Sequence, residues 1–223
     1  MHQRRSKKIL IYLFLLILVT SINNINLNGL KFDNIKEINV VGLGKKNNSI
    51  LLKKIKNLNL DNIFLLSKED INNQINSNSL VEKYNIFKRY PHSIDVTVVK
   101  TKFLAKINYN GKIYLIGSNG KLTEYKFSNT KLPFIFGKPA IEEFLNFKKI
   151  VDQSKFSYDE IKNIYFFSSK RWDLELRNNI IIKLNRNYPK DSLQLAFEFL
   201  KNNNLSNIKI IDARIENQII LNG

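Results

Sequence analysis

The sequence predicts an α+β protein with an N-terminal apolar helix, a small domain of two helices on a three-stranded sheet, and a mainly antiparallel β domain with flanking helices. Three observations carry this prediction. Residues 9–22 form an unbroken apolar run. Residues 35–100 follow the order strand, helix, helix, strand, strand, which is typical of a small α+β domain. After residue 104, short alternating segments are separated by turn dipeptides, and two amphipathic helices lie among them.

The apolar run predicts a membrane anchor. Its only residues with a polar group are Tyr12, Thr20 and Ser21. Four basic residues precede the run, and no acidic residue occurs among the first thirty. Basic residues beside an apolar segment stay on the cytoplasmic side of a membrane. We therefore expect a single-pass membrane protein with a cytoplasmic N-terminus, organised as a cytoplasmic tail at 1–8, a transmembrane anchor at 9–27, a tether at 28–34 and domains outside the cytoplasm after that.

The short length of the run leaves a cleaved secretory signal as the alternative. A spanning helix needs about 20 residues, and the run reaches that length only if it takes in Asn23, Asn24 and Asn26, which can sit at the membrane interface. A signal peptide usually ends in small residues of the A-x-A type, and no Ala occurs around Thr20-Ser21-Ile22. An uncleaved anchor is the favoured interpretation.

The composition indicates a folded protein and excludes cysteine chemistry. The chain is 43% hydrophobic with 15 Phe and 9 Tyr, so it can bury a core. It contains no Cys, which excludes disulfides, thiolate nucleophiles and Cys-based metal sites. The net charge of +17 would attract anionic lipid or acidic partners. The basic residues are scattered and the domains are expected outside the cell, so nucleic acid is not an expected partner; mutational bias of the genome also accounts for part of the charge.

The small domain, which we place at 35–103, is predicted from capping and alternation. Gly42 and Gly44 break the first strand, Ser49 is expected to cap the first helix, and Ser67 opens a capping-box pattern for the second. Pro91 separates the last two strands. The expected elements are strand 35–41, helix 49–56, a helix after Ser67 with Ile71 and Ile75 buried, strand 81–89 and strand 93–100 with Ile94, Val96 and Val98 on one face.

The second domain, at 104–223, is predicted from turns and short strands. Asn110-Gly111 is the strongest two-residue hairpin signal, and Asn119-Gly120 repeats it. Trp172 is expected to point inward on an alternating strand. The expected elements are strands 106–109, 112–116 and 121–127, a helix carrying Ile141, Phe144, Leu145, Lys148 and Val151, strands 164–168, 171–176 and 180–184, a helix at 192–201, and a closing strand pair at 208–221.

Several motifs in this order resemble the FtsQ/DivIB family of bacterial cell-division proteins. The most specific is Lys88-Arg89-Tyr90-Pro91-His92-Ser93-Ile94, which is similar to the family's R-aromatic-P-x-x-hydrophobic turn. After residue 100 the family often has E-x-x-P-x-A, of which this chain keeps only Ala105. The other matching segments are Val-Val-Gly at 40–42, Asn-Ile-Phe-Leu-Leu at 62–66, the L-P-x-x-x-G loop at 132–137, R-W-x-L-x-L at 171–176 and Ile-Asp-Ala-Arg at 211–214.

The resemblance implies a POTRA domain at 35–103, an FtsQ-type β domain at 104–223, and a non-enzymatic scaffold of the divisome at the septum. In that family the end of the β domain, with the preceding helix, binds FtsB, and FtsL accompanies it. An edge strand offers unpaired N–H and C=O groups to which a partner strand can add. The family usually has an aromatic residue after the Arg, where this chain has Ile215. The implied partner-binding residues are Arg214, Ile215, Glu216, Asn217, Gln218 and Ile219.

Arg89, Tyr90 and Pro91 form a second candidate contact site, implied by the same resemblance. The simpler interpretation is that they shape the turn between two strands. Asp212 and Arg214 likewise have a simple interpretation as an ion pair within the sheet.

The sequence carries no pattern for catalysis or for a cofactor. His2 and His92 have no second His or acidic cluster beside them, and neither G-x-S-x-G nor a phosphate-binding glycine loop occurs. We expect no enzymatic activity, no metal and no cofactor. The alternatives are an envelope transport or chaperone module, which predicts several POTRA repeats or a barrel, a periplasmic hydrolase, and a secreted periplasmic binding protein.

Overall fold

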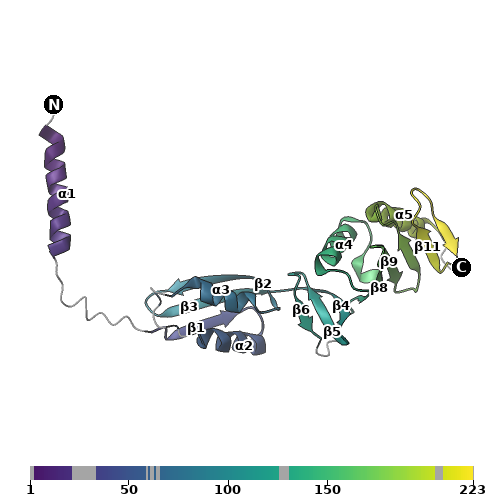
Figure 1. The fold of residues 1–223 in the computed structure, drawn as a ribbon, viewed down its shortest axis with the longest axis horizontal. Helices are drawn as coiled ribbons and strands as arrows, with labels where there is room; N and C mark the ends of the chain where they lie inside the picture. Colours follow the sequence, from purple (N-terminus) through teal and green to yellow (C-terminus); the bar gives the residue numbers. More distant parts are fainter. Residues whose placement is uncertain are drawn as a thin grey trace.

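The computed structural model describes residues 3–21, 34–58, 60, 63, 66–125, 131–203 and 208–222. Helix α1 (Gln3–Ser21) comes first, followed by a three-stranded sheet with two helices and a nine-stranded sheet with further helices (Figure 1). The mixed α+β class with a small and a large sheet agrees with the sequence prediction. We call the two parts the small domain and the large domain.

Helix α1 begins at Gln3, so it includes most of the predicted cytoplasmic tail as well as the apolar run. Its side chains from Ile9 to Val19 are all exposed. The remainder of the predicted anchor and nearly all of the predicted tether lie outside the described residues. Among the described residues, none of the helices combines the length and the apolar composition needed to cross a membrane.

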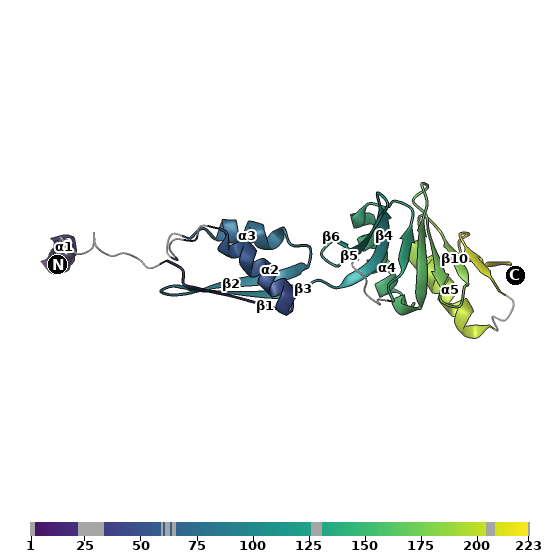
Figure 2. The ribbon, with the colours of Figure 1, turned by 90° about the horizontal axis from the view of Figure 1, so that it is seen from below.

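The small domain has both helices on one side of its sheet (Figure 2). Strand β3 lies in the centre, parallel to β1 and antiparallel to β2. The predicted strands 81–89 and 93–100 and the cap at Ser67, which accepts a hydrogen bond from the N–H of Glu69, are confirmed. The elements are β1 (Glu37–Val41), α2 (Lys45–Lys56), α3 (Lys68–Asn76), β2 (Val81–Arg89) and β3 (Ser93–Lys100).

The expected cap of the first helix at Ser49 is wrong, because α2 already begins at Lys45. Gly44 precedes it with φ 86°, and the side chain of Asn48 accepts the N–H of Leu43 at 2.9 Å. Asn48 therefore reaches back over the first turn, and Ser49 lies inside the helix. The family-like segment at 62–66 lies mostly outside the described residues.

The core of the small domain forms where β3 meets the two helices. Ile94, Val96 and Val98 are buried on one face of β3, as the alternation predicts. They belong to one cluster with four fully buried helix residues, Leu51 and Ile55 of α2 and Ile71 and Ile75 of α3.

The large domain is one sheet in the order β12-β11-β10-β9-β8-β7-β4-β5-β6. Pairing is parallel where β7 joins β4 and β8 and where β10 joins β11, and antiparallel elsewhere. The elements are β4 (Phe103–Tyr109), β5 (Lys112–Gly117), β6 (Leu122–Glu124), β7 (Phe134–Phe136), α4 (Ile141–Gln153), the 3₁₀ helix η2 (Tyr158–Glu160), β8 (Ile161–Phe166), β9 (Trp172–Leu176), β10 (Ile181–Leu184), α5 (Pro189–Asn202), β11 (Ile210–Ala213) and β12 (Ile220–Asn222).

Two expectations for this domain are corrected. The segment expected to be a loop at 132–137 contains strand β7, which completes the sheet between β4 and β8. The closing strand pair is present as the antiparallel strands β11 and β12, but residues 214–219, which were expected at the strand edge, form the turn that joins the two strands. The Asn110-Gly111 hairpin is confirmed, with φ values of 51° and 79° that this turn type requires.

A continuous row of paired apolar residues forms the core face of the large sheet. The row is Leu221, Ile211, Ile182, Leu174, Ile164, Ile135 and Ile107, each paired in register with the next. Phe144 and Phe147 of α4 and Leu193 of α5 cover it from one side. Trp172 is core, as expected, and its ring stacks on that of Phe147 with centroids 4.6 Å apart.

A polar joint connects the two domains. The carboxylate of Glu82 accepts hydrogen bonds from the hydroxyls of Thr101 at 2.9 Å and Ser118 at 2.7 Å. The side-chain amide of Asn119 donates to the carbonyls of Ser79 at 3.0 Å and Val81 at 2.8 Å. The start of β2 is therefore bonded to the turn between β5 and β6.

As far as the chain is described, both cores are formed by residues that follow α1. Every residue of both clusters lies between Ile35 and Ile219. A fragment that begins at residue 34 therefore keeps both cores and the joint between the domains.

The close approach of Gly42 to β3 predicts that Gly42→Ala destabilises the small domain. A Cβ at this position would lie 1.7 Å from the carbonyl oxygen of Val98. Gly44 also has a positive φ, yet a Cβ there would meet nothing within 4 Å. Both variants incur backbone strain of about 1–3 kcal/mol, and only Gly42→Ala adds a steric clash of about 1–3 kcal/mol.

Urea denaturation of the 34–223 fragment measures both variants. We expect Gly42→Ala to lose clearly more unfolding free energy than Gly44→Ala. Equal losses would show that the contact with Val98 does not limit the residue at position 42.

Candidate functional site

The residues that the sequence singles out at the C-terminal end lie at the edge of the large sheet, although not in a strand. Residues 214–219 form the turn between β11 and β12, with Asn217 at φ 57°. The N–H of Gln218 donates to the carbonyl of Ile215 at 3.3 Å. Asn tolerates the left-handed conformation, which explains why the chain turns here. Their role in partner binding stays a prediction.

The exposed edge itself is strand β12. It pairs with β11 on one side, and within the described chain no strand lies on its other side. Ile220 is 54% exposed and Leu221 is 45% exposed. Leu221 continues the apolar row of the core face, so Ile220 lies on the opposite face. The edge therefore offers both backbone groups and apolar side chains.

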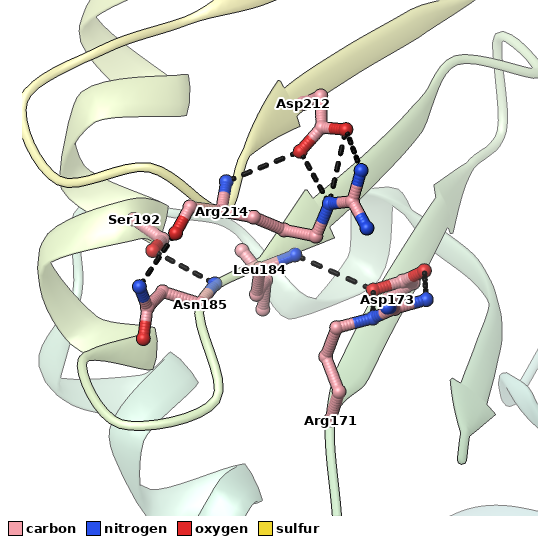
Figure 3. A network of polar contacts seen from close by, with 7 residues as sticks. All are labelled: Arg171, Asp173, Leu184, Asn185, Ser192, Asp212 and Arg214. Atoms are coloured by element: carbon pink, nitrogen blue, oxygen red, sulfur yellow. Dashed lines mark hydrogen bonds and ion pairs between the residues drawn. The ribbon is translucent and has the colours of Figure 1, made fainter. Parts of the chain in front are cut away.

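An ion pair fixes the chain as it leaves β11. The carboxylate of Asp212 accepts hydrogen bonds from Nε of Arg214 at 2.8 Å and from Nη2 at 2.6 Å (Figure 3). It also accepts the backbone N–H of Arg214 at 3.2 Å. These bonds from Arg214 hold the pKa of Asp212 below its usual value. The pairing within the sheet that the sequence suggests is confirmed.

The segment that leads into α5 is hydrogen-bonded to the turn between β11 and β12. The side-chain amide of Asn185 donates to the carbonyl of Arg214 (Figure 3). The hydroxyl of Ser192 accepts the N–H of Asn185 at 3.0 Å and donates to the carbonyl of Tyr188 at 3.1 Å. A cavity of about 80 Å³ lies between the turn and α5, lined in part by Tyr188, Ile215 and Asn217. Sequence reasoning missed Asn185 and Ser192; Pro189, which favours a helix start, was the available signal.

Charged residues alternate on the face of the sheet opposite the core. Lys183 pairs in register with Asp212 on one side and with Asp173 on the other. Asp173 is 3% exposed, and its carboxylate accepts bonds from Nε of Arg171 at 3.0 Å and Nη2 at 3.1 Å. Burial raises the pKa of Asp173 above its usual value in spite of Arg171. This face therefore carries charged side chains next to the apolar edge.

Arg89, Tyr90 and Pro91 lie far from this edge in the fold, on the small domain. They form the turn between β2 and β3, where Arg89 pairs with Asp95. Tyr90 is 59% exposed. The arrangement agrees with a role in shaping the turn, and a contact role stays a prediction.

The described residues contain no group of three or more His, Cys, Asp or Glu side chains placed to hold a metal. The geometry of the edge supports binding through backbone and side-chain contacts.

Comparison with known proteins identifies the class and then the family. The POTRA domain of FtsQ type matches residues 33–100, and the C-terminal domain of cell division protein FtsQ/DivIB matches residues 105–214. The chain thus has the domain composition of a bacterial cell division protein. It belongs to the FtsQ/DivIB family.

The similar proteins are division proteins of several bacteria. Cell division protein FtsQ of Rickettsia typhi is 26% identical over 194 residues, which cover 81% of this chain and 70% of that protein. Cell division protein DivIB of Staphylococcus aureus is 30% identical over 113 residues, which cover 51% of this chain and 22% of that protein. The solved major extracytoplasmic domain of DivIB from Geobacillus stearothermophilus matches 47% of this chain over 98% of that structure. The sequence identity is 11% and the TM-score is 0.35.

The Asp212–Arg214 pair predicts a pH-dependent contribution to stability. Because the folded-state pKa of Asp212 lies below 3.8, the pair stabilises the fold above that pH and its contribution is lost as the pH falls below it. We expect Asp212→Asn to cost about 1 kcal/mol of unfolding free energy at neutral pH. Denaturation of the unchanged protein and of Asp212→Asn at pH 7 and at progressively lower pH measures this. The difference between their unfolding free energies should disappear in acid. A difference that does not change with pH would contradict this role.

Proposed function

We propose that the protein is a membrane-anchored, non-enzymatic scaffold of the divisome that binds an FtsB-like protein by strand addition, accompanied by an FtsL-like protein. One observation carries the proposal: β12 ends the large sheet with both of its large apolar side chains exposed. In strand addition the backbone hydrogen bonds supply affinity, and side chains on alternate faces supply specificity.

The environment of β12 fits a partner strand that is apolar with acidic residues beside it. Ile220 and Leu221 point to opposite faces, so both sides of an added strand would meet an apolar neighbour. The side chain of Arg214 is 47% exposed although it is paired, and the chain carries a net charge of +17. Acidic residues on the partner would therefore be attracted to this end of the sheet.

The membrane part of the proposal rests on the sequence of α1 and on the family. With residues 9–27 as an anchor and 1–8 in the cytoplasm, the POTRA and β domains lie in the periplasm. Restriction to the membrane plane raises the effective concentration of partners that are tethered in the same membrane. The POTRA domain would recruit other division proteins, and the exposed turn at Arg89, Tyr90 and Pro91 is a candidate contact for them. The competing interpretation is a cleaved signal at the same position.

Proline substitution at β12 tests strand addition. Backbone N–H groups of consecutive residues in a strand point to opposite sides. One of the two variants Ile220→Pro and Leu221→Pro therefore removes an N–H that faces away from β11, and the other removes one that faces β11. We expect the variant that loses the N–H facing away from β11 to abolish co-purification of the FtsB-like partner. The melting temperature of that variant should be unchanged.

The matched controls are Ile220→Val and Leu221→Met, which keep both N–H groups and the apolar character. Both controls should retain the partner. Full partner binding by both proline variants would contradict strand addition at β12.

A further inference from the structure

Helix α2 presents a face of exposed lysines to solvent. Its sequence contains Lys45, Lys46, Lys53, Lys54 and Lys56 and no acidic residue. All five are exposed, and none of their ammonium groups makes a hydrogen bond or an ion pair with another described residue. The opposite side of the helix is buried in the core through Leu51 and Ile55. The lysine face is therefore held in place by the packing of the helix.

The five lysines occupy one half of the helix surface. With about 100° between successive residues, all of them fall within a half-circle that faces away from Leu51 and Ile55. Ile50 lies inside this half-circle and is 45% exposed, so the lysine face contains one large apolar side chain. The face is about 17 Å long, from the rise of 1.5 Å per residue.

The other helices of the two domains show that general lysine enrichment does not explain this face. Helix α3 carries Glu69 and Asp70 in its first turn, and α4 carries Glu142 and Glu143. Helix α5 has Asp191 in its first turn. Lysines on the other α-helices of the two domains are accompanied by acidic residues on the same helix, whereas α2 has none.

We propose that the lysine face of α2 docks the small domain on an anionic lipid surface. Lysines are attracted to anionic headgroups, and an apolar side chain among them can enter the boundary between headgroups and acyl chains. Lysine stems can lie along that boundary while the ammonium groups stay with the phosphates. The surface thus combines the two contributions that peripheral membrane binding requires.

The position of α2 in the chain favours lipid as the occupant. The exposed apolar helix α1 ends at Ser21, and the small domain begins with β1 at Glu37. The intervening residues reach at most about 50–60 Å when fully extended. A membrane that holds α1 is therefore always within reach of α2. The proposed binding through α2 does not require α1 to span the membrane, nor does it involve β12.

Vesicle sedimentation of the 34–223 fragment tests the proposal, because this fragment keeps both cores and lacks α1. The probes are vesicles of phosphatidylcholine alone and of phosphatidylcholine with phosphatidylglycerol. We expect binding only to the anionic vesicles, weakening as salt is raised. The double variant K53Q/K54Q should bind about 25-fold more weakly, at roughly fivefold for each lysine.

The matched control is K83Q/K100Q, which removes the same charge from two exposed lysines on strands of the same domain. It should bind the anionic vesicles nearly as well as the unchanged fragment. Equal loss in both double variants would show attraction by net charge alone and overturn the proposal. Failure to bind anionic vesicles, or lysine-dependent binding of a single-stranded nucleic acid in their place, would also overturn it. None of these outcomes bears on strand addition at β12.

Discussion

The large sheet does not close on itself, and this constraint determines how the molecule can be used. Within the described chain each interior strand pairs with a neighbour on both sides, whereas the end strands β12 and β6 each pair with one strand, β12 with β11 and β6 with β5. Proteins usually protect such an edge with charge, proline or a covering element. Here the last strand has Ile220 and Leu221 exposed, and Leu221 is the end of the apolar row that runs across the sheet from β12 to β4. The core of the domain thus extends to an edge that is left open.

The residues around β12 hold that edge in a defined position. Asp212 and Arg214 fix the end of β11, and Asn185 ties the following turn to the start of α5. At the β6 end of the large sheet, Glu82 and Asn119 join the small domain to it. The edge therefore lies at the end of the large sheet that is remote from the small domain (Figures 1 and 2).

The sequence predicted the elements whose signals are local. Alternation and Pro91 gave β2 and β3 to the residue, and Ser67 and the Asn110-Gly111 turn were correctly assigned. The start of α2 was misplaced because the helix begins after Gly44 without a side-chain cap, and Asn48 bonds back to the N–H of Leu43 before the helix. Strand β7 was missed because its three residues are held by parallel neighbours that are distant in sequence.

The candidate site was only partly predictable for the same reason. The pairing of Asp212 with Arg214 could be predicted because the two residues are only two positions apart, with Arg214 directly after β11. An edge in the segment that closes the domain was also predicted. The location of the edge was misplaced, because residues 208–221 are rich in β-branched residues and the turn depends on the left-handed conformation of Asn217. The bond from Asn185 to the carbonyl of Arg214 joins residues 29 positions apart, and no local pattern indicates it.

Hydrogen exchange of the backbone amides of β12 tests the open edge most directly. In the isolated full chain, at least one amide of residues 220–222 should exchange rapidly while the amides of β10 and β11 are protected. In the complex co-purified with the FtsB-like partner, that amide should become protected. An amide that is already protected in the isolated chain, or one that still exchanges rapidly in the complex, would contradict the account.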